Sequence, residues 1–338
     1  MTNIKTVSEL AGVSVATVSR TFQFPEKVAP STREKVLAAA ERARYRPDGL
    51  ARNFRTRRSN AIMVMVPNIS NPFFSEVLRA MQETAFDRGY SVLLGDTQGD
   101  PERERTYLDF LGTRQADGVI QLGAHVPTTL PFPRTDDENV AAPFVHVCEA
   151  PTPSPFPSVR INNEAAAFAV TQHLIAMGRH RIAAVLGPKN SPLTADRLAG
   201  WKRALEELGA GSDDSLIYEG DFTLQAGQDA VARILAAAAH PDAIFFFNDE
   251  MAIGGLQGLK EAGIAVPDDM AVAGFDDIAF ARFTEPALTT VRQPKKQIGE
   301  AAMTMLIDLI EDKNTPPQNT VLDASLVIRT STGQAGKP

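Results

Sequence analysis

Hydroxyl side chains and one arginine near the N-terminus have types and spacing that could recognise DNA. In TVSELAGVSVATVSR, Thr6 can cap a helix, with Glu9 three residues later completing a capping box. Gly12 permits a turn, and Ser14 can cap a second helix that carries Arg20. Two short helices around a glycine turn place the second helix in the major groove, where it can donate hydrogen bonds to bases and phosphates.

A third helix is predicted to support the first two. Ser31 and Glu34 repeat the capping box immediately before EKVLAAAERARY. The apolar residues of this segment that are predicted to share one helical face are Val36, Leu37, Ala40 and Ala43. The pattern therefore predicts a three-helix bundle over residues 1–46.

The charge distribution agrees with a DNA-binding N-terminus. The whole chain has a formal net charge of -7, but residues 1–58 contain 12 Lys and Arg against 5 Asp and Glu, a net +7. Residues 59–338 contain 22 basic and 36 acidic residues, a net -14. A module that neutralises phosphates must be locally basic, so the alternative of a merely charged N-terminal bundle is disfavoured.

The segment PDGLARNFRTRRS joins this module to the rest of the chain. Pro47 ends the third helix, and Asp48 can cap a short new helix that contains Phe54. A helix this short is marginal alone in water. DNA could hold it through the cluster Arg52, Arg55, Arg57 and Arg58. A disordered basic linker is the alternative for the free protein.

From Ala61 onward, short apolar runs alternate with amphipathic stretches, which is typical of an α/β fold with buried parallel strands. The runs are AIMVMV, SVLLG, GVIQLG, PFVHV, RIAAVLG, AIFFFN, MAVAGF and SLVIR. The proline-rich PTPSPFPS interrupts the series and predicts two smaller lobes instead of one large sheet. Ligands bind at the carboxyl ends of parallel strands. The segments at those ends are 68–74, 148–149, 187–197, 248–249 and 275–277.

Composition and scattered residues argue against several other classes. At 338 residues, with 43% hydrophobic and 22% charged residues, the chain has the composition of a globular protein of two to three domains. No apolar run approaches a membrane span, and the chain does not open with an apolar signal segment, so we expect a cytoplasmic protein that does not bind membranes. The single cysteine, Cys148, excludes an intrachain disulfide and a cysteine-rich zinc site.

Catalysis, metal binding and a cofactor are not expected. The five histidines show no metal-ligand spacing, and no glycine-rich phosphate loop follows the first strand. Cys148 fits a small buried residue better than a nucleophile. Two alternatives stay open: a sugar- or nucleoside-binding sensor without direct operator recognition, and an α/β enzyme of sugar metabolism fused to a regulator.

Many motifs, in order along essentially the whole chain, resemble the lactose-repressor family of bacterial transcription regulators. They are TVSELAGVSVATVSR, STREKV, YRPDGLAR, PNISNPFF, GRHRIA, RLAGW, FFNDEMAIG, VAGFDD and LTTVRQP. The resemblance implies a helix-turn-helix headpiece over 1–46, a hinge helix over 47–59 and a core over 60–338 that resembles periplasmic binding proteins. It also implies an N-lobe of about 60–159 plus 291–320 and a C-lobe of about 160–290 plus 321–332.

The same resemblance implies a ligand-responsive repressor. Its partners would be a second copy of the chain, double-stranded operator DNA with a near-palindromic sequence, and a nucleoside or sugar effector. The recognition positions are Ser14, Val15, Ala16, Thr17, Ser19 and Arg20. The hydroxyls expected on phosphates are those of Thr6, Thr17, Ser19 and Thr32, and the hinge positions are Arg52, Phe54, Arg55 and Arg57.

Two of these positions depart from common members of the family. Val15 and Ala16 are apolar, so base readout would depend on thymine methyl groups and on Arg20 contacting guanine. Phe54 stands where many members insert a leucine between base pairs; a phenyl ring can also wedge a base step.

The effector positions implied by the resemblance are Phe73, Phe74, Arg197, Phe222, Asn248, Asp276 and Gln293, and the carboxyl-end rule adds Glu149. A carboxylate accepts two hydroxyls and a guanidinium donates in a fork, so Asp276 and Arg197 suit a polyhydroxylated ligand. The alternatives are ordinary core for the Phe pair and a turn residue for Asp276. Ser191 replaces an arginine that a purine-responsive member uses on its base, which argues against a free purine base.

Overall fold

The computed structural model describes residues 3–45, 58–125, 127, 143–151, 154, 156–209, 211, 213–311 and 319–333. The chain forms two compact units, residues 1–58 and residues 59–338, and each is described by itself. Arg52, Phe54, Arg55 and Arg57 of the predicted hinge helix lie outside the described residues.

The N-terminal unit is a bundle of three helices: α1 (Ile4–Ala11), α2 (Val15–Gln23) and α3 (Pro30–Arg42), with a short 3-10 turn η1 (Pro25–Lys27) between the last two. Its core consists of the buried side chains Val7, Val18, Val36, Ala39 and Ala40. This confirms the predicted three-helix arrangement. Leu37, expected in that core, is 47% exposed, because it lies a third of a turn away from the face that carries Val36 and Ala40.

The turn between α1 and α2 is built as predicted. Gly12 adopts a φ of +65°, a left-handed conformation that favours glycine, and closes α1. The Ser14 Oγ then accepts a hydrogen bond of 3.1 Å from the Thr17 backbone N–H and caps α2.

Two other predicted caps are wrong. Asn3, not Thr6, caps α1, and its Oδ1 accepts the Thr6 N–H at 3.1 Å. Helix α3 begins at Pro30 after Ala29, with no side-chain cap, so Ser31 lies inside the first turn. Proline has the φ of a first helical residue and lacks the N–H that a cap would satisfy, so it starts α3 ahead of Ser31.

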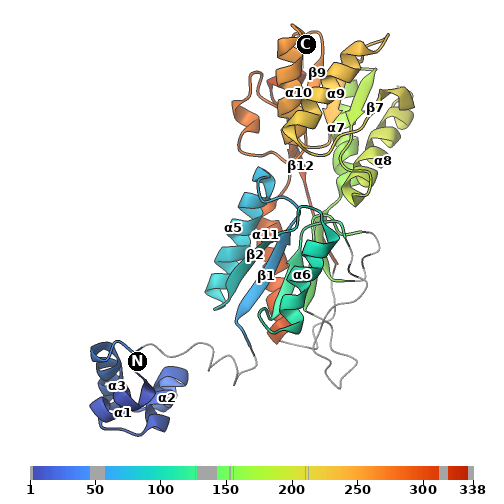
Figure 1. Cartoon of the computed structure of the whole chain (residues 1–338). Helices are drawn as coiled ribbons and strands as arrows, with labels where there is room; N and C mark the ends of the chain where they lie inside the picture. The colour runs from blue at the N-terminus through green and yellow to red at the C-terminus, as the bar shows by residue number, and fades with distance from the viewer. Residues whose placement is uncertain are drawn as a thin grey trace. The chain divides into compact units, whose positions relative to one another are not determined.

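The second unit has two α/β lobes (Figure 1). The N-lobe sheet is entirely parallel, in the order β11-β5-β4-β3-β1-β2. Its strands are β1 (Ala61–Val66), β2 (Ser91–Asp96), β3 (Gly118–Gln121), β4 (Phe144–Val147), β5 (Ser158–Ile161) and β11 (Asn319–Leu322). Its helices are α5 (Pro72–Asp87), α6 (Pro101–Gly112) and α11 (Lys295–Glu311).

Strand β1 explains why the run AIMVMV is apolar without alternation. Ile62, Val64 and Val66 belong to the core that also contains residues of α5 and α11. Met63 and Met65 belong to a separate cluster with Leu108 and Leu111 of α6. Successive side chains of a strand point to opposite faces, so a sheet covered on both sides requires apolar residues at every position.

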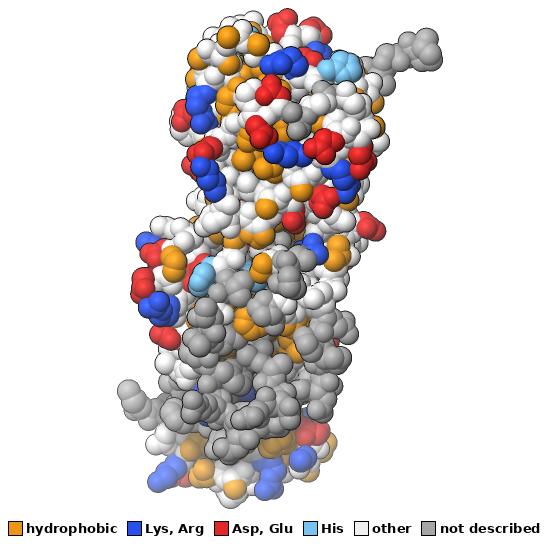
Figure 2. All heavy atoms as spheres, turned by 90° about the vertical axis from the view of Figure 1, so that its right-hand side faces the viewer, with side chains coloured by type: hydrophobic (Ala, Val, Ile, Leu, Met, Phe, Trp, Pro, Cys, Tyr) orange, Lys and Arg blue, Asp and Glu red, His pale blue; other side chains and the backbone are white. Residues whose placement is uncertain are grey.

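The C-lobe sheet is also parallel, in the order β7-β6-β8-β9. Its strands are β6 (Ile182–Val185), β7 (Ile217–Tyr218), β8 (Ala243–Phe246) and β9 (Ala271–Ala273). Helix α7 (Asn163–Ala176) packs on α8 (Pro192–Glu207), and α9 (Leu224–Ala236) packs on α10 (Asp249–Glu261). On the face shown in Figure 2, acidic and basic side chains are interspersed over this lobe.

The chain passes between the lobes three times, from β5 to α7, from β10 (Thr290–Arg292) to α11, and from β11 to β12 (Ser325–Val327). Strands β10 and β12 pair antiparallel, so the run SLVIR is not a parallel strand as expected. The α/β prediction with two lobes is otherwise confirmed. Among the helices in the described ranges, none is long and apolar enough to cross a membrane.

Candidate functional site

A cavity of about 620 Å³ lies between the two lobes, at the carboxyl ends of their strands. Both lobes line it. The structure brings together at this cavity all eight residues expected to contact an effector: Phe73, Phe74, Glu149, Arg197, Phe222, Asn248, Asp276 and Gln293. Their sequence positions span more than two hundred residues, so the fold, not local sequence, collects them.

Four non-glycine residues that line the cavity have a left-handed backbone conformation. The φ angles are +53° at Gln98, +63° at Cys148, +70° at Phe222 and +114° at Asp276. This conformation is unfavourable for residues with a Cβ and persists where the surroundings enforce it. Such strain is concentrated at binding sites, which makes the cavity a candidate ligand site.

Phe73 and Phe74 form an aromatic wall of the cavity at the start of α5. The Asn71 Oδ1 accepts the Phe73 N–H at 2.9 Å and fixes the first turn of the helix. The two rings meet edge to face with centroids 5.2 Å apart, and the residues are only 5% and 6% exposed. The Phe pair therefore belongs to the core and also lines the cavity.

Phe222 lies on the C-lobe side, where its ring packs directly against Gly187. A Cβ placed on Gly187 would overlap that ring, so any larger residue would force Phe222 to move. The Asn248 Nδ2 donates to the Phe222 carbonyl at 2.9 Å, while its Oδ1 accepts the Met251 N–H at 3.0 Å and caps α10. Asn248 thus fixes the position of Phe222 relative to α10.

Arg197 of α8 lines the cavity with a permanent positive charge, and its side chain is only 2% exposed. Its Nε donates to the Asn163 Oδ1 at 3.0 Å, and Nη1 donates to the Phe247 carbonyl. The guanidinium stacks on the Phe275 ring, 3.6 Å from the centroid, and its Nη2 lies 3.8 Å from the Asp276 Oδ1. These contacts hold the plane of the guanidinium fixed.

Asp276 follows β9 and accepts from the first residues after β10. The Gln293 Nε2 donates to its Oδ1 at 2.7 Å, and the Lys295 Nζ donates to its backbone carbonyl at 3.0 Å. Burial raises the pKa of Asp276 to about 6, opposed by the charge of Arg197. The carboxyl is therefore predominantly ionised at neutral pH.

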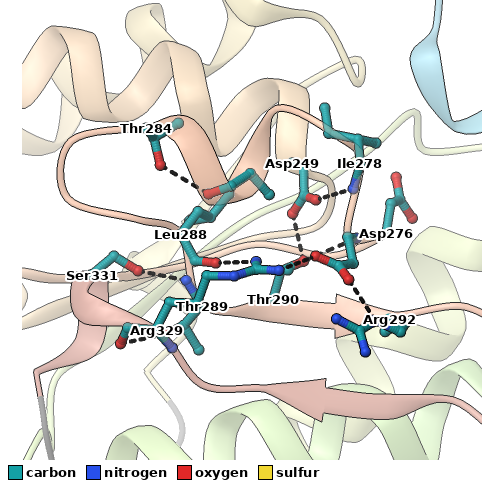
Figure 3. A network of polar contacts seen from close by, with 12 residues as sticks. Asp249, Asp276, Ile278, Thr284, Leu288, Thr289, Thr290, Arg292, Arg329 and Ser331 are labelled. Carbon is teal, nitrogen blue, oxygen red and sulfur yellow. Dashed lines mark hydrogen bonds and ion pairs between the residues drawn. The ribbon is translucent and has the colours of Figure 1, made fainter.

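A polar network holds the loop that carries Asp276 (Figure 3). Asp249 accepts the Ile278 N–H at 2.9 Å and the Thr290 hydroxyl at 2.5 Å. On the other side of the loop, Arg292 and Arg329 donate to Asp277 at 2.7 and 2.5 Å. The loop is thus tied to the segments that connect the lobes.

Glu149 and Ser191 form a hydrogen bond that the sequence did not predict. The Ser191 Oγ, at the start of α8, donates to the Glu149 Oε2 at 3.0 Å, which joins the C-lobe to the N-lobe across the cavity. Burial raises the pKa of Glu149 to about 7, although the Ser191 hydrogen bond opposes that shift. No local pattern could reveal the pair, because the two residues are 42 positions apart and lie in different lobes.

Glu104 and His125 are in polar contact at the N-lobe side of the same cavity. The His125 Nδ1 lies 2.6 Å from the Glu104 Oε2, and Glu104 is 3% exposed. Burial raises the pKa of Glu104, and the neighbouring His125 opposes that effect. Sequence reasoning did not select either residue, although both line the cavity.

The described residues give no support to Cys148 as a nucleophile or to a metal site. Burial raises the pKa of the Cys148 thiol, which disfavours the thiolate that a nucleophile requires. Among the residues whose positions the structure gives, no group of three or more His, Cys, Asp or Glu could hold a metal ion.

The headpiece presents polar, apolar and basic side chains along α2. The side chains of Ser14, Val15, Ala16 and Arg20 are exposed, and those of Thr6, Thr17, Ser19 and Thr32 are partly buried. Val18, between the exposed positions, is fully buried and holds α2 against the core. All eight headpiece positions proposed for DNA contact therefore retain some accessible surface.

A helix-turn-helix unit in one chain with a two-lobed core around a ligand-sized cavity defines the class of ligand-binding bacterial regulators. Family models agree. Residues 3–48 match "Bacterial regulatory proteins, lacI family", and residues 171–332 match "Periplasmic binding protein-like domain".

A curated relative, the HTH-type transcriptional repressor CytR of Escherichia coli (strain K12), is 37% identical over 329 residues, which cover 97% of this chain and 96% of the relative. The chain belongs to the lacI family and is a transcriptional regulator. Within the family, the motifs that most resemble CytR are the segments PNISNPFFSEV and GDFT, and Pro192–Leu193 ahead of Arg197–Leu198.

Two solved structures match nearly the whole chain. The lac repressor dimer bound to operator and the anti-inducer ONPF has a TM-score of 0.84 and 27% identity, covering 97% of this chain and 98% of that one. The transcriptional regulator CelR in complex with cellobiose has a TM-score of 0.73 and 29% identity, covering 97% of this chain and 99% of that one.

Proposed function

We propose that this protein is a ligand-responsive repressor that binds a near-palindromic operator as a homodimer and takes a nucleoside or sugar as its effector. It acts in the cytoplasm, where operator DNA lies, and it is not an enzyme. The observation that carries the proposal is the presence, in one chain, of an accessible recognition helix and of a two-lobed cavity lined by aromatic and hydrogen-bonding side chains.

The headpiece supports direct reading of DNA. In a helix-turn-helix, the N-terminal residues of the second helix contact base edges. Here those residues are Val15, Ala16 and Thr17, with Arg20 one turn further along. Apolar side chains can contact thymine methyl groups, and the Arg20 guanidinium can donate to the O6 and N7 atoms of guanine.

The hinge supplies the second part of the DNA interface in this proposal. Phe54 would wedge into the minor groove, and Arg52, Arg55 and Arg57 would contact phosphates. A dimer is required, because a palindromic site presents the same half-site twice. The lac repressor structure with operator is a dimer, which supports the same assembly here.

The cavity supports a ligand with a ring face and several polar groups. Phe73, Phe74 and Phe222 offer aromatic surface, whereas Arg197 and Asp276 offer a donor and an acceptor of hydrogen bonds. Cellobiose in the CelR complex is a polyhydroxylated ligand of this kind.

Two measurements on the full-length chain test the proposal. Selection from random double-stranded DNA should enrich a near-palindromic site, and a thermal-shift screen of nucleosides and sugars should find a compound that raises the melting temperature. A ligand at 100 times its dissociation constant adds about 2.7 kcal/mol to the free energy of unfolding. Enrichment of no sequence, together with a stabilising ligand, would favour the sensor without operator recognition; turnover of that ligand would show an enzyme.

A further inference from the structure

The cavity is strongly biased toward acidic side chains. Among the described residues that line it are the carboxylates of Asp96, Glu104, Glu149, Asp221 and Asp276. Arg197 is the one lining residue there with a permanent positive charge, and His125 is already paired with Glu104. A ligand with a negative charge would therefore meet like charges on both lobes.

Arg197 does not offset this bias, because its charge is already matched within the protein. Its Nη2 faces the Asp276 carboxylate at 3.8 Å, and Nε and Nη1 are occupied by Asn163 and the Phe247 carbonyl. A phosphate bound to Arg197 would have to compete with Asp276. A neutral hydroxyl could accept from the remaining N–H groups and leave the Arg197–Asp276 pair intact.

Glu149 is held in place as an acceptor that faces the cavity. Serine at the start of a helix normally caps it, but the Ser191 side chain makes no capping hydrogen bond to α8 and donates instead to the Glu149 Oε2. Within the described part of the chain, no hydrogen bond reaches the Glu149 Oε1. This oxygen can accept a hydrogen bond from a ligand.

From the charge of the cavity and the orientation of Glu149, we infer that the effector is unphosphorylated and places a hydrogen-bond donor, a hydroxyl or an amino group, against the Glu149 carboxylate. The inference rests on the proposed function, because it concerns the effector of that same cavity. It assigns Glu149 as a specificity-determining residue: its carboxylate accepts from the ligand and repels phosphate.

Calorimetric titration of matched compounds into the full-length protein tests the inference. The compounds are cytidine, uridine and cytidine 5′-monophosphate; adenosine, inosine and adenosine 5′-monophosphate; and glucosamine, glucose and glucose 6-phosphate. Within the group that binds, we expect the unphosphorylated members to bind at least about tenfold more tightly than the phosphorylated one, because like charges in a desolvated site oppose binding.

The variant Glu149→Gln tests whether Glu149 determines the preference for an unphosphorylated ligand. Glutamine keeps the shape and can still accept from Ser191, but it removes the negative charge. We expect the preference for the unphosphorylated compound to fall about tenfold or more, through weaker binding of that compound, tighter binding of its phosphate, or both. The control is Glu83→Gln on α5, the same change at an exposed residue outside the cavity lining, which should leave the preference unchanged.

The outcomes separate the two proposals. Tighter binding of a phosphorylated member, or an unchanged preference in Glu149→Gln, overturns the inference about the ligand and leaves the proposed function standing. No binding by any of the nine compounds, with operator selection successful, counts against both the inference and the effector part of the proposed function.

Discussion

Individual residues that line the cavity make a contact that holds the fold together and also present surface that a ligand can reach. Asn248 caps α10 and also fixes Phe222, while Asp276 accepts from Gln293 and faces Arg197. Because these side chains are held by protein neighbours, little of their freedom is lost when a ligand binds. The site is preorganised by the same contacts that stabilise the fold.

The first prediction concerns the pH dependence of effector affinity. Burial raises the pKa of Glu149 to about 7, and a donor from the ligand would stabilise the ionised form. Ligand binding should then release a proton when the pH is below about 7, so affinity should rise as the pH increases toward about 7, by at most about tenfold per pH unit, and level off above it. Calorimetry at several pH values measures this dependence.

Other groups facing Glu149 must be separated from it. Asp276 titrates near pH 6, Glu104 has a raised pKa and Arg197 stays charged. The Cys148 thiol, with its raised pKa, stays neutral. The control is Glu149→Gln, in which the rise between about pH 6 and about pH 7 should disappear. A rise of the same size in Glu149→Gln would assign the titration to one of the other groups.

The second prediction concerns Arg20. If Arg20 contacts a base, Arg20→Ala should cost about 1–3 kcal/mol of operator binding and relax the preference at one position. Arg57→Ala, at a position expected to contact phosphate, should weaken binding to every sequence alike and flatten the salt dependence. Fluorescence anisotropy on single-base operator variants measures both effects, and equal losses on all sequences from both variants would refute the assignment of Arg20.

At the level of elements, helix starts could be predicted only in part from sequence. The cap at Ser14 was found because serine, a turn glycine and an apolar pattern coincide there. The boxes at Thr6 and Ser31 also fit the pattern, but Asn3 and Pro30 lie earlier in the chain and start the helices first. A capping motif marks a possible helix start, but in α1 and α3 the helix begins at the earlier residue that can also start it.

Strands that coincide with a continuous apolar run were found, and strands without such a run were missed. The segment SVRI of β5 was missed because Arg160 and Ser158 interrupt its apolar character, and NTVL of β11 is an edge strand with exposed positions. The carboxyl-end rule correctly located the segments that line the cavity. The Glu149–Ser191 contact needed three-dimensional structure, since it joins the two lobes.

The third prediction tests the cap of the recognition helix. Ser14→Ala removes the acceptor for the Thr17 N–H and should destabilise α2 by about 1 kcal/mol. Hydrogen exchange in full-length protein should show faster exchange in the first turn of α2, together with weaker operator binding. Ser31→Ala is the matched control, because Ser31 does not cap α3 and its replacement should change neither quantity.

The fourth prediction tests the packing of Phe222. Gly187→Ala would place a methyl group 2.1 Å from the ring and force Phe222 to move, so effector affinity should fall at least about tenfold. Operator binding without effector should be unchanged. Gly123→Ala is the control on the opposite wall, since its nearest atom would lie 3.7 Å away, an ordinary contact. Equal affinities in the two variants would show that Phe222 does not contact the ligand.

At the scale of the whole molecule, ligand binding in the cavity can affect how the two lobes are arranged, because residues of both lobes line the cavity. A ligand that contacts Glu149 on one lobe and Asp276 on the other changes the relative stability of lobe arrangements. If those arrangements differ in how the hinges of a dimer meet, effector and operator affinities are linked, with a coupling of about 1–3 kcal/mol on the usual scale.

The fifth prediction concerns Asp276, through which effector binding would be coupled to operator affinity. Asp276→Asn keeps the shape of the side chain but replaces a charged acceptor, so the effector should no longer change operator affinity, while operator affinity without effector stays the same. Operator titrations with and without effector measure the coupling. Asp87→Asn, at an exposed residue of α5, is the matched control. A retained response to the same ligand at the same concentration would show that the cleft is assigned wrongly.

The three passages between the lobes also determine the order in which the chain can fold during synthesis. The C-lobe strands β6, β7, β8 and β9 are complete once residue 273 has left the ribosome. Helix α11, which packs on α5 and against β3, β4 and β5, begins only at residue 295, and the edge strand β11 at residue 319. Until then, apolar strand residues such as Ile120, Val145 and Val159 lack part of their cover. Domains usually fold in the order in which they are synthesised. In this chain the lobe that is translated first is completed only after the C-lobe sheet, so its open sheet must stay protected from aggregation while the C-lobe sheet is made.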